Sequence, residues 1–243
     1  MIRFIRTFSF LGLYLIYSIP ALKKVKALPE SLSVTDRDHL VHELPKRWSR
    51  GIMARTKSEI IVSGLENLDD EPALLVSNHE GNFDIPALIG HLPKAFGFMA
   101  KAELTKAAIL SEWMKQMNCV FIDRTNRRSS LKSVLDAVEV LKNGHSLLIF
   151  PEGTRSKSDK VEEFKTGAVK IAQRAQVPII PIAVSGTSEL LETSPKGTIQ
   201  KAVIYLSVLP KIDTPDILSA DSVELTNRIK VSIIEEKYKH KRS

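Results

Sequence analysis

Residues 73–91 read ALLVSNHEGNFDIPALIGH, and this stretch contains the transition that decides the fold. The run Ala73–Ser77 is short and apolar, which is typical of a buried strand. Polar residues and one glycine follow it, and Ile85–His91 then returns to a helical pattern of apolar residues. A strand, a loop and a helix in this order form the repeating unit of α/β proteins.

The same alternation continues through residues 58–243 and predicts one α/β domain there, with a mostly parallel or mixed sheet flanked by helices. The predicted strands are Ile60–Val62, Ala73–Ser77, Phe96–Met99, Val120–Ile122, Ser146–Phe150, Ile179–Val184 and Ala202–Val208. The predicted helices are Ile85–His91, Leu104–Met117, Ser129–Lys142, Thr166–Gln176 and Ser222–Tyr238.

Residues 1–57 differ from the rest of the chain in charge. They hold 11 Lys and Arg against 4 Asp and Glu, whereas residues 58–243 hold 24 of each. The whole net charge of +7 therefore lies in the first quarter of the chain. A nucleic-acid enzyme usually carries its basic charge around its cleft. Basic residues that flank an apolar segment indicate attraction to anionic lipid headgroups instead. We therefore expect no nucleic-acid partner.

The first quarter contains 16 consecutive uncharged residues, Thr7 to Leu22. A spanning helix usually needs about 20 apolar residues, and Pro20 limits this one further. The positions before Pro20 and Ala21 make poor signal-peptidase sites. The pattern favours a retained helix inserted shallowly in one leaflet, with a spanning helix, a cleaved signal and a buried core helix as alternatives.

A second helix is predicted after a capping box at Thr35–Asp38. Apolar residues recur at helical spacing through Ile52, and Pro45 predicts a kink or a break. His39 and His42 lie three positions apart on this helix, but no third metal ligand follows nearby, so we expect both to be solvated. We assign residues 1–57 to two membrane-associating helices.

Asn78 and His79 directly follow the strand Ala73–Ser77, and Asp84 opens the next helix. Within one helix, the offset between His79 and Asp84 would place them roughly 140° apart, so their contact requires a turn. Gly81 supports one. A carboxylate bonded to one ring nitrogen leaves the other nitrogen as a base. The alternative is that Asp84 caps its helix and His79 is a surface residue.

A second cluster, residues 150–156 with the sequence FPEGTRS, also follows a predicted strand. Gly153 favours a turn, Thr154 adds a hydroxyl, and the planar guanidinium of Arg155 is suited to bind phosphate oxygens. Glu152 is expected either to accept from a substrate hydroxyl or to hold Arg155. The alternative is a structural turn with a solvated arginine. Two more cations, Arg124 and Lys101, stand at strand margins.

The single cysteine, Cys119, excludes an intrachain disulfide and a four-cysteine zinc site. No histidine adjoins it, and the chain lacks a Gly-x-Ser-x-Gly nucleophile elbow. We therefore expect no metal, no cofactor and no covalent enzyme intermediate.

These clusters, taken in order, resemble the glycerolipid acyltransferases, and most closely the bacterial 1-acylglycerol-3-phosphate acyltransferases. The family's first block, Asn-His-four residues-Asp, matches Asn78–Asp84. Its other blocks match Phe121–Arg124, Phe150–Ser156 and Val177–Ile182. At Glu80-Gly81 this chain departs from the commoner Gln-Ser or Arg-Ser.

The resemblance implies acyl transfer from a thioester of coenzyme A or acyl carrier protein to the hydroxyl of lysophosphatidate, giving phosphatidate. His79 would be the general base and Asp84 its orienting partner. Arg155, Arg124 and Lys101 would hold the acceptor phosphate, while Glu152 and Gly153 would shape its site. The enzyme would act at the inner face of the cell membrane as a monotopic or peripheral protein, in phospholipid biosynthesis.

Other acceptors stay open, namely glycerol 3-phosphate and a lyso-ornithine lipid. A non-catalytic, membrane-binding member of the fold is a further alternative, although such a protein is expected to lack the His79/Asp84 pair.

Overall fold

Seven strands form one sheet in the order β1-β7-β6-β2-β5-β3-β4. The computed structural model describes residues 2–123, 126–194 and 197–239. Neighbouring strands are parallel throughout except for the antiparallel pair of β6 and β7, so the predicted sheet is confirmed. The strands are β1 Glu59–Ser63, β2 Leu74–Ser77, β3 Gly97–Lys101, β4 Val120–Ile122, β5 Leu147–Ile149, β6 Ile179–Ser185 and β7 Val203–Val208.

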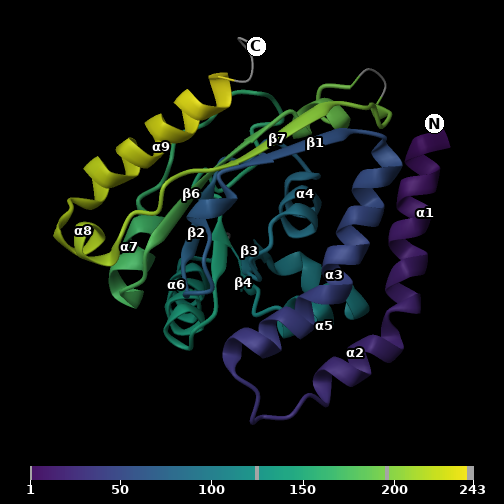
Figure 1. Ribbon diagram of the computed structural model, residues 1–243, viewed down its shortest axis with the longest axis horizontal. Helices are drawn as coiled ribbons and strands as arrows, with labels where there is room; N and C mark the ends of the chain where they lie inside the picture. The colour runs from purple at the N-terminus through teal and green to yellow at the C-terminus, as the bar shows by residue number, and fades with distance from the viewer. Residues whose placement is uncertain (1, 124–125, 195–196, 240–243) are drawn as a thin grey trace.

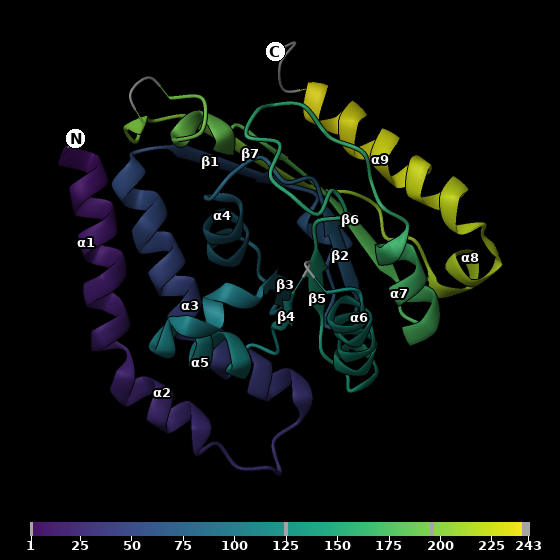
Figure 2. The same cartoon turned by 180° about the vertical axis from the view of Figure 1, so that it is seen from behind.

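Helices cover both faces of the sheet (Figures 1 and 2). The N-terminal helices α1 to α5 lie on one face, and α6, α7 and α9 lie on the other. The α-helices are α1 Ile2–Tyr17, α2 Ile19–Lys26, α3 Val34–Thr56, α4 Asp84–His91, α5 Ala108–Gln116, α6 Arg127–Lys142, α7 Gly167–Ala175, α8 Thr214–Ser219 and α9 Ser222–Lys239. The 3₁₀ helices bounded within the described ranges are η1 Leu65–Asn67, η2 Ala102–Lys106 and η3 Thr187–Leu190.

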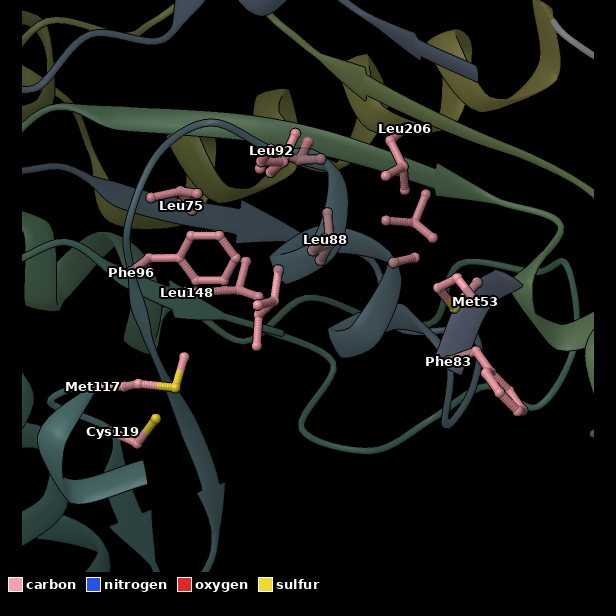
Figure 3. Close-up of a cluster of buried hydrophobic side chains, with 14 of the residues drawn as sticks. Met53, Leu75, Phe83, Leu88, Leu92, Phe96, Met117, Cys119, Leu148 and Leu206 are labelled. Atoms are coloured by element: carbon pink, nitrogen blue, oxygen red, sulfur yellow. The ribbon is translucent and has the colours of Figure 1, made fainter. Parts of the chain in front are cut away.

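The central strands are buried on both sides, as parallel strands between two helical layers must be. On β2, Leu74 faces α6 to α9, whereas Leu75 belongs to the core beneath α3 and α4. Leu147 and Leu148 alternate on β5 in the same way. Figure 3 shows Leu75 and Leu148 packed near Phe96 and Leu88. This two-sided burial holds β2 and β5 in place, and the loops that carry His79 and Arg155 emerge from their ends.

The predicted N-terminal helix is bent at Ser18, where α1 ends, and Pro20 lies in the first turn of α2. The indole N–H of Trp113 on α5 donates to Ser18 Oγ at 2.8 Å, which ties the bend to the domain. No single helix in the described ranges has the length and hydropathy to cross a membrane. The two segments Arg3–Tyr17 and Ile19–Lys26, bent by 46°, meet that criterion only as a pair.

Helix α3 begins two residues earlier than predicted, because Ser33 and not Thr35 is the cap, and Ser33 Oγ accepts from the backbone N–H of Asp36 at 3.1 Å. Pro45 lies inside α3 and does not end it. The expectation of a solvated His42 was wrong. Its ring is buried, donates to Asp38 O at 2.7 Å and accepts from the N–H of Phe96 at 3.1 Å.

One face of α3 is part of the main core, through Val41, Ile52 and Met53. Residues 1–57 therefore pack against the α/β domain through α3 and through α2, whose Leu22 and Val25 are buried in the same core, while α1 lies outside α3 (Figure 1).

Two helical segments differ from the prediction. The stretch predicted as one helix, Leu104–Met117, contains the end of η2 and all of α5, separated at Ala107, where ψ is 86°. No glycine or proline marks that break. The short helix α8 was missed, although Asp213 as its cap and a proline in its first turn are a recognised start signal.

We predict that Leu148→Ala destabilises the fold by about 2–5 kcal/mol, since it empties a fully buried site in the central strand. Leu148 is 0% exposed. The check is urea unfolding in detergent, with Leu131→Ala as control, since Leu131 is 57% exposed on α6. Equal unfolding midpoints for the two variants would contradict the assignment of Leu148 to the core.

Candidate active site

The loops that carry the two polar clusters emerge from one edge of the sheet. Strands β2, β5 and β3 are parallel neighbours, so their carboxyl ends lie together. In α/β sheets this edge is the usual place of ligand sites. The loop after β2 carries His79, the loop after β5 carries Arg155, and Lys101 is the last residue of β3.

His79 and Asp84 are in direct contact. Nδ1 of His79 donates to Asp84 Oδ2 at 2.6 Å, through a turn at Asn82 and Phe83. Within the ranges that the structure describes, Nε2 has no hydrogen-bond partner, and the His79 side chain keeps 19% of its surface exposed. The bonded carboxylate fixes the tautomer with a proton on Nδ1 and leaves Nε2 as an accessible base.

Asp84 is fully buried and receives two further hydrogen bonds. The backbone N–H of Gly81 donates to Oδ2 at 3.1 Å, and the hydroxyl of Thr187 donates to Oδ1. Asp84 is also the first residue of α4, where the helix dipole stabilises negative charge. These contacts stabilise the ionised form of a carboxylate that has no exposure to water.

The position of His79 is fixed from two sides. The side-chain amide of Asn78 exchanges two hydrogen bonds with the backbone of Val184 on β6, each of 2.8 Å, which extends the β2–β6 pairing by one residue. The imidazole of His79 stacks on the ring of Phe150, with centroids 4.0 Å apart and planes inclined by 11°. The first residue of the second cluster therefore supports the histidine of the first.

The loops after β2 and β5 are also joined through their backbones. Ser156 N donates to His79 O at 2.8 Å, and Lys157 N donates to Glu80 O at 3.0 Å. Glu152, which we expected to meet a substrate hydroxyl or Arg155, has other partners. Its Oε1 accepts from the N–H of His79 at 2.6 Å, and its Oε2 accepts from the N–H of Glu162 at 3.0 Å. Glu152 thus braces the loop that bears the histidine.

Arg155 lies beside the turn between His79 and Asp84. Its Nη1 donates to Asn82 Oδ1 and lies 3.8 Å from Glu192 Oε1. Glu192 also accepts from the N–H of Asn82 at 2.7 Å. The guanidinium is therefore held at the mouth of the site, with a third of its surface exposed.

The rest of the second cluster shapes the turn. Gly153 has φ +74°, a conformation that favours glycine, and a Cβ there would lie 3.1 Å from Lys165 Nζ. Thr154 is exposed. Lys165 was not singled out from the sequence, because it lies ten residues after Arg155 in a region without a motif.

Of the two remaining predicted cations, Lys101 is exposed at the end of β3, on the same sheet edge as His79. Arg124 lies outside the described residues.

An apolar cavity of about 400 Å³ lies between α1, α3, α4 and α5. Its lining includes Asn82 and Phe83, in the turn between His79 and Asp84, and Phe8 and Leu11 of α1. A cavity of this size and character matches the apolar sites in which proteins bind small organic ligands.

Cys119 is buried, and burial raises the pKa of its thiol to about 12. A thiol so protonated is a poor nucleophile. Among the described residues, no group of three or more His, Cys, Asp or Glu side chains is arranged to hold a metal ion.

The sequence profile described as Acyltransferase matches residues 59–185, which include the loops after β2 and β5. The chain belongs to the acyltransferase family.

This acyltransferase is 34% identical over 199 residues to a Mycoplasma pneumoniae protein named "Probable 1-acyl-sn-glycerol-3-phosphate acyltransferase". The alignment covers 79% of this chain and 71% of that protein. A protein of the same name from Mycoplasma genitalium is 32% identical over 236 residues, with 89% and 82% covered. The crystal structure of the 1-acyl-sn-glycerophosphate acyltransferase PlsC from Thermotoga maritima superposes with a TM-score of 0.75 at 25% identity, covering 97% of both chains.

We predict that His79→Ala in this acyltransferase lowers kcat by about 10³-fold or more, because general-base catalysis commonly contributes 10²–10⁴-fold. Asp84→Asn should also lower kcat, since the amide permits the wrong imidazole tautomer. The measurement is initial-rate acyl transfer, with circular dichroism to show that each variant is folded. Near-normal turnover of His79→Ala at saturating substrates would sink the general-base assignment.

Proposed function

We infer that this chain is an enzyme of phospholipid biosynthesis that acylates the free hydroxyl of 1-acyl-sn-glycerol 3-phosphate, giving phosphatidate. The observation that carries the inference is the His79/Asp84 pair, set beside the Arg155 loop at one sheet edge. The names of the mycoplasma relatives and of the Thermotoga structure support the acceptor.

The chemistry assigned to His79 is proton transfer in a single displacement. Nε2 accepts the proton of the acceptor hydroxyl while its oxygen attacks the thioester carbonyl. The new C–O ester bond forms, the C–S bond breaks, and the imidazolium returns the proton to the leaving thiolate. Asp84 stabilises the imidazolium through Nδ1–H. No covalent enzyme intermediate is required, which agrees with the buried, protonated thiol of Cys119.

The acceptor phosphate is assigned to the cations around the mouth of the site. Arg155 supplies a bidentate, permanently charged donor. Lys165 stands against Gly153, and Lys101 stands on the same sheet edge. Arg124 joins this group on the strength of the family's second block alone. Asn82 and Glu192 pre-orient the guanidinium, which reduces the entropy lost when phosphate binds.

The apolar cavity suits a fatty acyl chain. Its walls are almost entirely hydrophobic, and they include Asn82 and Phe83 of the loop that carries His79. A chain bound there would present its carbonyl to the base. The donor is a thioester of coenzyme A or acyl carrier protein, and the reaction needs neither metal nor cofactor.

The N-terminal helices are assigned to the inner face of the cell membrane. Helix α1 lines the cavity with one face and exposes Leu13, Ile16 and Tyr17 on another, at 67%, 61% and 72%. Exposed apolar residues next to a basic segment are typical of helices that lie in the headgroup region. A shallow insertion would place the cavity and His79 near the depth at which lysophosphatidate presents its hydroxyl.

The test of the proposed function is an acceptor panel with purified protein in detergent, read by product mass. We expect phosphatidate from lysophosphatidate, and little product from glycerol 3-phosphate, a lyso-ornithine lipid or monoacylglycerol.

Arg155→Ala should lower kcat/KM on lysophosphatidate about ten- to hundredfold, as expected for a lost charge-assisted hydrogen bond of about 1.5–3 kcal/mol.

The matched control is Arg174→Ala, an exposed arginine near the far end of α7. The loss in Arg155→Ala should be small on monoacylglycerol, which lacks the phosphate. Equal losses of kcat/KM on lysophosphatidate and monoacylglycerol would mean that Arg155 supports the fold and does not bind the phosphate. If the wild-type protein acylates another acceptor faster than lysophosphatidate, that acceptor is the substrate and the proposed one is wrong.

A second prediction concerns the membrane. Replacing Leu13, Ile16 and Tyr17 together by Ser should weaken binding to vesicles of phosphatidylglycerol and phosphatidylcholine by at least about tenfold, because each large apolar side chain contributes on the order of 1.5 kcal/mol or more when buried. High salt should weaken binding of the wild-type protein only in part. Vesicle co-sedimentation measures both.

The control for this triple variant replaces three exposed apolar residues elsewhere, Leu131, Leu135 and Val231. Vesicle binding that drops equally in both triple variants would refute a specific role for α1.

A further inference from the structure

A second ion pair lies directly behind the catalytic loop. Glu80, next to His79, pairs through Oε1 with the ammonium of Lys237 in the last turns of α9. Both side chains are 0% exposed. The other carboxylate oxygen, Oε2, accepts from the N–H of Ser188 at 3.1 Å and from its hydroxyl at 3.2 Å.

Stability alone is a poor explanation for this pair. The cost of removing two charges from water usually offsets their attraction, so a buried pair adds little to folding. Helix α9 is already anchored by Leu225, Ile229 and Ile233 in the core on its side of the sheet. Burial raises the pKa of Glu80, and Lys237 counteracts that shift. What distinguishes the pair is its position next to the groups that hold Asp84.

The hydroxyl of Thr187 connects the two carboxylates. It is a hydrogen-bond donor to Asp84 Oδ1 and also lies 3.2 Å from Glu80 Oε2. A hydroxyl has one proton to donate, so the two carboxylates compete for it. Lys237 and Ser188 supply Glu80 with other donors. Thr187 is therefore left to donate to Asp84.

We propose that Lys237 is a positioning residue for acyl transfer, which acts by satisfying Glu80 so that Thr187 donates its proton to Asp84 and holds the carboxylate in register with His79. This inference rests on the proposed function, since it takes His79 and Asp84 as the catalytic pair. Lys237 touches neither of them and acts through two intermediate side chains.

Lys237→Met keeps the length of the side chain and removes its charge. Glu80 then has one donor fewer and draws on Thr187. We expect kcat to fall about tenfold with both KM values within about twofold, the scale of one weakened hydrogen bond to a charged group. Thr187→Val should lower kcat to a similar extent. In the double variant Glu80→Gln/Lys237→Met, no carboxylate competes, so kcat should return to within about threefold of wild type.

A double-mutant cycle separates this mechanism from a structural clip on α9. If Lys237 acts through Thr187, then Lys237→Met adds no further loss of kcat to Thr187→Val. Two independent structural losses would instead multiply to about a hundredfold. The control is Lys230→Met, which removes the 2.5 Å ion pair of α9 with Glu163 and should leave kcat unchanged.

The rates are measured with full-length protein in detergent, on whichever acceptor the wild-type enzyme acylates fastest. A different acceptor would therefore revise the proposed function without affecting this test. Three outcomes would overturn the proposal. They are an unchanged kcat in Lys237→Met, losses of kcat that multiply when Lys237→Met is combined with Thr187→Val, and a change in KM alone. If Lys237→Met does not fold, the Glu80→Gln/Lys237→Met variant decides, because a tenfold loss of kcat there would refute it.

Discussion

The site depends on one constraint, which is that the buried carboxylate of Asp84 must be given enough hydrogen-bond donors to stay charged. It has no contact with water, and an unpaired charge there would be too costly to keep. Its three donors come from two parts of the chain, namely His79 and Gly81 in the loop after β2 and Thr187 in η3. The sheet edge, the turn and the start of α4 are arranged so that these donors converge. The imidazole of His79 is thus the partly exposed end of a buried network.

The sequence predicted the sheet well because the central strands are buried on both sides and appear as short apolar runs. All seven predicted strands are present, with ends shifted by one or two residues. The pairing of His79 with Asp84 was predictable, because spacing and turn chemistry are local. The errors arose where local pattern has little information. Ala107 interrupts a helical pattern without a turn residue, and the buried ring of His42 bonds to the backbone of Phe96, 54 positions away.

The partners of Glu80 and Gly81 could not be predicted either, because they lie far away in the sequence. Glu80 and Gly81 departed from the commoner family residues, and the structure gives each a partner far along the chain. Glu80 meets Lys237. A Cβ on Gly81 would lie 2.5 Å from Glu192 Oε2, so a serine there would require Glu192 to move. Each departure is thus matched by a second residue, and only a folded chain brings the members of each pair together.

The contact between Glu80 and Lys237 has a consequence for synthesis of the enzyme. It joins residues 157 positions apart. The ribosome must therefore release the last turns of α9 before the loop that bears His79 can acquire all the neighbours described here. That loop and the carboxylate of Asp84 are synthesised long before the last side chain that packs behind them. A chain cut short before Lys237 would keep most of its apolar core and lack the polar contact behind the His79 loop.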